Sequence, residues 1–133
     1  QLTQIEIGYL AGFIDGEGSL IINKREHIGY KGKRYTTYSA YIDIGNTNIK
    51  CLEYIHKLLG ISSKLYSSQS KGNRKLAHRM RISYKQAHPL VKLLQPYLIV
   101  KRDIAELFLE YKDSKDKNAL FEKAKILNKR GIF

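Results

Sequence analysis

Residues 10–18 read LAGFIDGEG, and this stretch carries most of what the sequence says about the fold. Bulky apolar side chains alternate with Gly8, Ala11 and Gly12 at helical spacing, and the stretch then ends in acids set among glycines. Small residues one helical turn apart allow two helix backbones to approach closely. The final Gly-Glu-Gly leaves the carboxylate of Glu17 on a backbone with little steric cover. The pattern predicts a helix that packs closely against another helix and ends in an accessible acid.

The composition indicates one basic domain. The chain has 133 residues, with 24 Lys and Arg against 12 Asp and Glu and a net charge of +12. No acid lies between Glu53 and Asp103, although many Lys and Arg do. A run this one-sided predicts a surface that faces phosphates, and the bland alternative is a generally basic protein kept soluble by its charge. We therefore expect a polyanionic partner.

The remaining bulk features concern the cellular compartment. The single cysteine, Cys51, rules out an internal disulfide and fits a reducing compartment, where it is expected to be a buried structural thiol. No apolar run is long enough to cross a membrane, and no secretory signal is visible. We expect an intracellular protein that acts away from membranes, with an organelle and an archaeal cytoplasm both open.

Periodicity predicts an α+β domain with the order αββαββα, in which a four-stranded antiparallel saddle has helices packed on one face. The first helix begins near residue 4 under a capping box formed by Thr3 and Glu6. We assign residues 1–113 to this domain and residues 114–133 to its charged, weakly helical C-terminal tail. The other elements are expected as strands near 19–28 and 37–44, a helix over 49–59 capped by Thr47 or Asn48, strands over 61–68 and 76–84 around a turn at 71–74, and helices over 85–94 and 102–111.

The strand face opposite the helices carries mostly hydrogen-bonding side chains, and antiparallel ribbons can enter the major groove of DNA. A strand of about ten residues spans about 33 Å, so one subunit would follow about ten base pairs and a dimer about twenty. Asp43 on this face would be costly among phosphates unless it reads a cytosine amino group. The candidate DNA-binding residues are Asn23, Arg25, His27, Tyr35, Thr37, Ser39, Tyr41, Asp43, Lys64, Tyr66, Ser68, Lys71, Arg74, Lys75, Arg79 and Arg81.

Residues 10–18 resemble the signature of the LAGLIDADG homing endonucleases, and the αββαββα order is that of one repeat of this family. The resemblance implies that two signature helices pack together and deliver one acid each to a metal site. Because the chain has one signature, it implies a symmetric homodimer that makes a double-strand break in a long, near-palindromic DNA site. The break would cross the minor groove and leave short 3′ overhangs. The expected interface residues are Gly8, Tyr9, Ala11, Gly12, Phe13, Asp15 and Gly16.

Glu17 is the central candidate for the chemistry. Phosphodiester hydrolysis by a hard divalent ion needs carboxylate and carbonyl oxygens as ligands. The resemblance assigns that role to Glu17, with the Gly16 carbonyl as second ligand, Mg²⁺ as the expected ion, and Mn²⁺ or Ca²⁺ able to occupy the site. The alternative is a surface acid in a tight turn. Asp15 is expected to be structural, orienting the turn or accepting hydrogen bonds from backbone amides.

Three further catalytic candidates follow from the resemblance. Residues 95–98 read QPYL, and with Lys101 they resemble the family segment that sets a lysine beside the active site. There its ammonium would offset charge on the scissile phosphate or polarise the attacking water. Asn46 matches the place of a water-positioning residue, and Lys50 is a supporting candidate. The alternatives are a phosphate-contacting or solvated Lys101, a helix-capping Asn46, and a plain basic Lys50.

Three other functions fit parts of the sequence. An RNA-binding intron maturase could use the same basic sheet and would prefer structured RNA over duplex DNA. A non-catalytic DNA-binding regulator on this scaffold would not need Glu17. A basic ribosome-associated domain leaves the small residues of the first helix unexplained.

Overall fold

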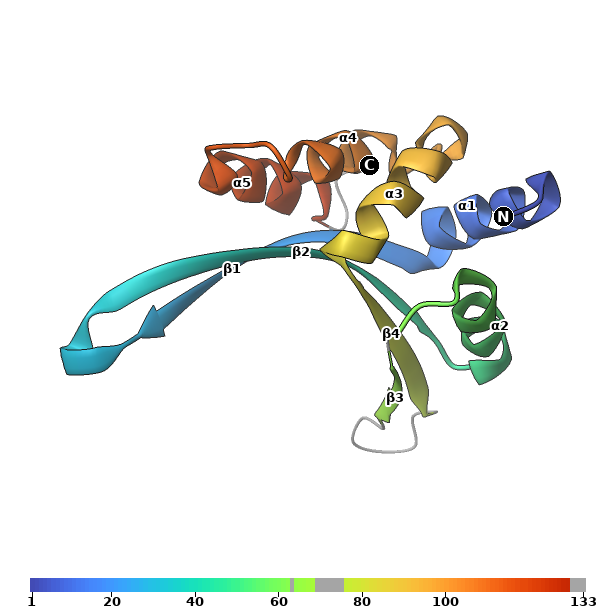
Figure 1. The fold of residues 1–133 in the computed structure, drawn as a ribbon, viewed down its shortest axis with the longest axis horizontal. Helices are drawn as coiled ribbons and strands as arrows, with labels where there is room; N and C mark the ends of the chain where they lie inside the picture. The colour runs from blue at the N-terminus through green and yellow to red at the C-terminus, as the bar shows by residue number, and fades with distance from the viewer. Residues whose placement is uncertain (63, 69–75, 130–133) are drawn as a thin grey trace.

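The computed structural model describes residues 1–62, 64–68 and 76–129. Within them the chain folds as an α+β domain whose helices gather over one face of a curved sheet (Figure 1). The fold class is as predicted. The elements are α1 (Gln4–Glu17), β1 (Gly18–Ile28), the 3₁₀ turn η1 (Tyr30–Gly32), β2 (Arg34–Asn46), α2 (Ile49–Leu59), β3 (Leu65–Ser68), β4 (Ala77–Ser83), α3 (Tyr84–Leu94), the 3₁₀ turn η2 (Gln95–Tyr97), α4 (Arg102–Glu110) and α5 (Lys117–Leu127).

Helix α1 begins at the predicted capping box. The Thr3 backbone N–H donates to Glu6 Oε1 at 2.8 Å, and the Glu6 N–H donates to Thr3 Oγ1 at 3.1 Å. This reciprocal pair satisfies donors that the first helical turn leaves without partners. Ile7, Leu10 and Ile14 turn the buried side of α1 toward the core. Because the cap and this apolar spacing fix the rotation of the helix, its glycines lie on the opposite, exposed side.

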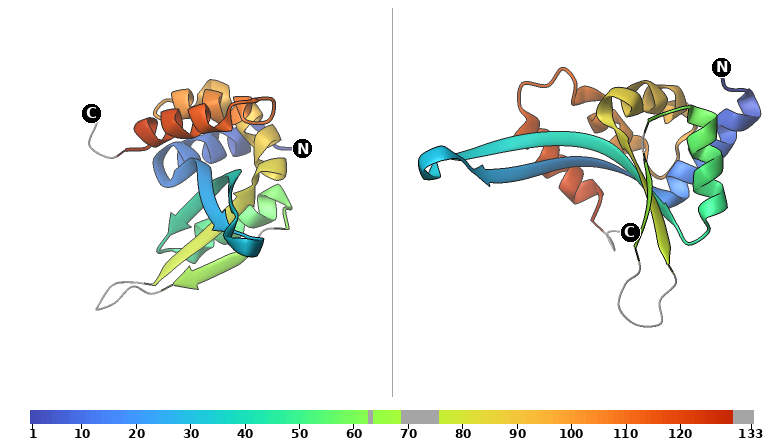
Figure 2. Two further views of the ribbon diagram at one scale, coloured as in Figure 1. Left: turned by 90° about the vertical axis from the view of Figure 1, so that its left-hand side faces the viewer. Right: turned by 60° about the horizontal axis from the view of Figure 1, so that its bottom comes forward.

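The sheet is antiparallel with the strand order β1-β2-β4-β3. Leu20 pairs with Ile42, which pairs in turn with Ile82, so buried apolar side chains line up across three strands on the helix-covered face. Since strand side chains alternate between faces, the neighbours Tyr41 and Arg81 lie on the other face. The hairpin of β1 and β2 projects well beyond the helices, as Figure 1 and the right-hand view of Figure 2 show. The sheet therefore offers a long polar face that the helices leave open.

The second half of the sheet departs from the prediction at one strand. Asn48 caps α2, its side chain accepting from the Lys50 N–H, and Gly60 ends the helix with φ 60°. Strand β3 pairs with β4 only from Leu65 onward, whereas the prediction began it at residue 61. The described residues 61, 62 and 64 belong to no strand, so β3 is shorter than predicted. The predicted turn at 71–74 lies outside the described residues.

The C-terminal tail is more ordered in structure than the sequence predicted. Residues 117–127 form the regular helix α5, capped by Asp116 and burying Leu120 and Ala124. Its end is fastened to the sheet by Asn128, whose Nδ2 donates to the Leu20 carbonyl at 3.1 Å. The tail thus packs on β1 and α4 as part of the core layer. Among the residues that the structure describes, no helix is both long and apolar enough to cross a membrane.

Candidate active site and nucleic-acid interface

The end of α1 is joined to the loop between η2 and α4 by one carboxylate. Asp15 accepts hydrogen bonds from the backbone N–H groups of Ile99 at 3.0 Å, Val100 at 3.0 Å and Lys101 at 2.9 Å. Partial burial raises the pKa of Asp15, but these backbone hydrogen bonds and the Lys101 charge outweigh it and hold the pKa below its ordinary value. Asp15 thus accepts hydrogen bonds from backbone amides, as predicted. We call this junction of residues 15–18 with residues 98–101 the α1 corner.

The α1 corner also fixes the ammonium group of Lys101. Its Nζ donates to the backbone carbonyl of Asp15 at 2.6 Å. Burial lowers the pKa of Lys101, and the carboxylates of Asp15 and Glu17 oppose this shift without cancelling it. Lys101 is half-buried and is held at the end of α1 by its hydrogen bond to Asp15. It thus differs from an ordinary solvated lysine.

Glu17 lies exposed at the end of α1, on the wall of a cleft of about 550 Å³. The same cleft is lined by Gly16, Lys101, Asp103 and Asn128. Within the described ranges no three His, Cys, Asp or Glu side chains gather as a metal site would require. A single copy thus offers the Glu17 carboxylate and the Gly16 carbonyl, hard oxygen donors suited to Mg²⁺, but too few of them to hold an ion alone.

Asn46 and Lys50 lie where β2 leads into α2. The Asn46 Oδ1 accepts from the Asn48 N–H at 2.8 Å, so this side chain closes the turn before the helix. Gly18, the first residue of β1, pairs with Ile44, so Asn46 lies two residues further on, at the end of β2 next to the point where α1 passes into β1. Lys50 lies exposed in the first turn of α2. The structure brings Glu17, Gly16 and Lys101 into one cleft, with Asn46 at the adjoining edge and Lys50 further out on α2.

The outer side of α1 carries a row of glycines that no other described residue of the same copy covers. A Cβ at Gly8, Gly12 or Gly16 would meet no atom within 4 Å, so packing inside one copy does not require glycine there. Glycine inside a helix costs about 1 kcal/mol relative to alanine. Ile5, at the start of the same helix, is 86% exposed. The helix therefore presents an unused close-packing surface, which we call the glycine row.

The other predicted interface residues divide between the inside and the outside of the copy. Ala11 is 2% exposed and belongs to the core of the same copy, because it faces the sheet side of α1. Tyr9 stacks on the half-buried Phe13 with ring centroids 6.0 Å apart, and it meets the edge of Tyr54 at 5.4 Å. The sequence analysis did not select Tyr54, since its position in α2 gave no sign of this contact.

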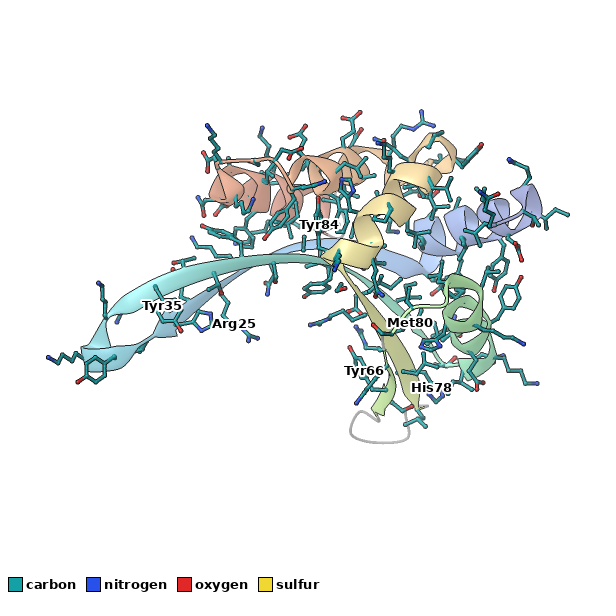
Figure 3. All side chains as sticks on the ribbon, viewed as in Figure 1. Arg25, Tyr35, Tyr66, His78, Met80 and Tyr84 are labelled. Atoms are coloured by element: carbon teal, nitrogen blue, oxygen red, sulfur yellow. The ribbon has the colours of Figure 1, made fainter. Side chains whose placement is uncertain are left out.

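The polar face of the sheet holds the candidate DNA-binding residues as networks of side chains. His27 shares a hydrogen bond with Thr37 at 2.7 Å and stacks on Tyr35 at 4.8 Å. The guanidinium of Arg81 lies over the Tyr41 ring, 4.0 Å from its centroid. Figure 3 shows Arg25 and Tyr35 on the hairpin and Tyr66 on β3. The residues on this face are Asn23, Arg25, His27, Tyr35, Thr37, Ser39, Tyr41, Asp43, Tyr66, Arg79 and Arg81.

The rest of the predicted interface is placed less closely. Lys64 precedes β3 and Ser68 is its last residue, whereas Lys71, Arg74 and Lys75 lie outside the described residues. A hollow of about 750 Å³ runs along the face beside Arg25 and Arg81. Ser62, Gln86 and Tyr111 also line it, and none of the three was predicted from the sequence.

A basic sheet face beside a cleft with an acid and a half-buried lysine defines a protein of the nucleic-acid-processing class. The profile of the LAGLIDADG endonuclease family matches residues 10–116, which is most of the chain. The protein belongs to the LAGLIDADG endonuclease family. No curated protein matches the chain by sequence.

Solved structures with the same fold are also homing endonucleases. The archaeal intron-encoded homing endonuclease I-Vdi141I, complexed with DNA, is 19% identical with a TM-score of 0.74, covering 96% of this chain and 86% of that one. I-CvuI, in complex with the I-CreI target and 2 mM Mg with the DNA not cleaved, is 20% identical with a TM-score of 0.76, covering 98% and 86%. The LAGLIDADG meganuclease I-CpaMI, bound to uncleaved DNA, is 25% identical with a TM-score of 0.63, covering 89% of this chain and 41% of that one.

Proposed function

We propose that two copies of this chain form a metal-dependent homing endonuclease that makes a double-strand break in a long, near-palindromic DNA site. The observation that carries the proposal is the α1 corner, where Asp15 fixes the loop that holds Lys101 in the same cleft as Glu17. Membership of an endonuclease family supports the DNA-cleaving activity.

Pairing through α1 is supported by two independent features. The glycine row leaves space for a second helix at van der Waals distance, and within one copy nothing fills that space. A two-fold axis beside α1 would bring the Glu17 carboxylates of both copies to one place. In addition, this chain covers 86% of I-CvuI but only 41% of I-CpaMI, so it corresponds to less than half of the longer protein.

Within the paired site each residue has a distinct task. Glu17 and the Gly16 carbonyl would hold a divalent ion, which when bound supplies activation of water and neutralisation of charge on phosphate oxygens. The Lys101 ammonium, kept in place by its bond to the Asp15 carbonyl, faces the scissile phosphate and offsets its developing charge. Asn46 orients the attacking water from the adjoining edge, and Lys50 adds positive charge beside it. Asp15 joins the end of α1 to the loop that carries Lys101 in the same copy, without touching the substrate.

The polar sheet face would select the DNA site. Its residues offer donors and acceptors that suit base edges in the major groove, and the net charge of +12 favours the phosphate backbone. The projecting β1–β2 hairpin lengthens the contact along the duplex. A recognition site of about twenty base pairs follows for two copies.

The test is a cleavage selection on a pool of palindrome-biased duplexes in Mg²⁺, with the cut ends sequenced. Wild type should yield ends that converge on one site, and Glu17→Gln should lose cleavage while its affinity stays within about tenfold, because this carboxylate holds metal and contributes little to docking. Glu26→Gln removes the same charge from the other face of β1 and should cut as wild type does. Tight duplex binding without cutting by wild type would favour the regulator, and a preference for structured RNA would favour the maturase.

A further inference from the structure

Two charged residues on the polar face of the sheet form an ion pair that the proposed function leaves without a role. Arg79 on β4 donates from Nη1 to Asp43 Oδ2 on β2 at 2.8 Å. The register places Arg79 opposite Gly45, and Asp43 opposite Arg81. Arg79 therefore reaches along β2 past its own partner residue to meet the carboxylate.

Gly45 allows this path. A Cβ on Gly45 would lie 3.6 Å from Arg79 Cγ and 3.9 Å from Arg79 Nε, so the arginine stem lies against the bare backbone of β2. With its stem on Gly45 and one N–H on Asp43, the guanidinium has a defined orientation. A free arginine on an exposed strand would sample many rotamers instead.

The two partners differ sharply in exposure. The Arg79 side chain is 50% exposed, whereas Asp43 is only 11% exposed. Oδ1 of Asp43 is buried and has no hydrogen-bond partner among the described residues, while Oδ2 is taken by Arg79. The expected direct reading of a cytosine by Asp43 thus has no free, accessible oxygen to act through. Arg79 keeps N–H donors on Nε and Nη2 that can still reach a base.

We propose that Asp43 is a specificity-positioning residue, which aims the guanidinium of Arg79 at a guanine in the major groove. This inference rests on the proposed function, since it assumes that the polar face lies on DNA. A guanidinium recognises guanine by two parallel N–H hydrogen bonds. This bidentate contact is more favourable when the guanidinium is already held in one orientation. Arg81 provides the contrast: it lies on the Tyr41 ring, which holds a cation without fixing which N–H points outward.

The test is the binding of wild type, Asp43→Asn, Arg79→Ala and the double variant to the selected duplex and each of its single-base-pair changes, without divalent metal. Arg79→Ala should flatten the preference at one base pair in each half-site. Asp43→Asn should lower the preference for the original base pair at the same position by about tenfold. Affinity for a random duplex should change by less than about threefold. Asp43→Asn should add nothing to Arg79→Ala in the double variant.

The control is Glu26→Gln, which makes the same charge change on the opposite face of the sheet. Its affinities for the selected duplex and for each single-base-pair change should equal those of wild type. Circular dichroism checks folding, and Asp43→Glu, which keeps the charge but moves it by one methylene, should disturb the same base pair if Asp43→Asn does not fold. An unchanged profile, or flattening at other base pairs than Arg79→Ala affects, overturns the inference alone. A wild type with no sequence preference overturns the proposed function as well.

Discussion

The α1 corner and the polar face of the sheet are built in different ways. At the α1 corner a carboxylate accepts from three backbone amides, and a lysine donates to a backbone carbonyl. On the sheet, side chains hold side chains: Arg79 on Asp43, Arg81 on Tyr41, and His27 on Thr37. The corner therefore depends on the path of the chain, whereas the face can change residue by residue without moving the backbone. We therefore expect chemistry and target choice to be separable in this fold.

The largest expected effect comes from filling the glycine row. Gly12→Leu has open space within one copy, so each copy should stay folded with unchanged or higher stability, because leucine favours helix more than glycine. Between two copies the added side chain meets the partner twice. At about 1–3 kcal/mol for each overpacked contact, the dimer dissociation constant should rise about 30-fold to 10⁴-fold. Sedimentation velocity and cleavage of the selected site measure both effects.

A matched variant places leucine on another exposed helix. Glu122→Leu on α5 should leave the sedimentation and cleavage of wild type unchanged. If Gly12→Leu still pairs and cuts as wild type does, the copies do not meet through the glycine row.

The second effect is the loss of the carboxylate that joins the α1 corner. Asp15→Ala should lower the free energy of unfolding by about 2–3 kcal/mol, since hydrogen bonds to a charged group are worth more than neutral ones and solvent screens part of the gain. Cleavage should fall at every DNA site alike, because the loop that carries Lys101 is released. Urea unfolding and cleavage of two different selected sites measure these changes.

The same variant has a defined pH dependence. The pKa of Asp15 lies below 3.8 in the folded chain, so its contribution is complete above the unfolded pKa and is lost as pH falls through the folded one. The stability difference between wild type and Asp15→Ala should be constant from about pH 5 to about pH 7 and should narrow below about pH 4. A stability difference between the two proteins that grows as the pH falls would contradict the claim that an ionised Asp15 holds the α1 corner.

The smallest effect is expected on the sheet face. Tyr41→Leu removes the ring under Arg81 and should weaken binding of the selected duplex about three- to fivefold, in line with about 0.5–1 kcal/mol for an exposed cation–π contact. Tyr41→Phe keeps the ring and is the control, with affinity within about twofold of wild type. Cleavage of bound DNA at saturation should be the same for all three proteins. A slower cut at saturation would mean that the face and the corner are coupled.

Local signals made most of the fold predictable. The Thr3–Glu6 box, the alternation along β1 and β2, and the glycine at position 60 each act within a few residues, so the sequence reveals them directly. Asp15 could also be assigned a structural role, although not its partners, because Ile99 and Val100 lie far away in the chain. The C-terminal tail was predicted only as charged and weakly helical, because the contacts that hold α5 join residues far apart in the sequence, such as Asn128 and Leu20.

The sheet face shows where sequence reasoning stops. Alternation identified Asp43 and Arg79 as residues of the same face, but the pairing of these two depends on the register between β2 and β4, which sets Arg79 opposite Gly45. This register is not encoded near either residue. Tyr54 and Gln86 were missed for the same reason, since their contacts come from elements that only the fold brings together.

The central claim is that each copy contributes one Glu17 to a shared site. Its most direct test is a mixed dimer of wild type and Glu17→Gln, carrying different affinity tags and purified by both, on the selected duplex in Mg²⁺. We expect the mixed dimer to bind the site with the affinity of wild type and to make no double-strand breaks. Double-strand cleavage at half the wild-type rate or more would mean that one Glu17 suffices, and would contradict a site built from two copies.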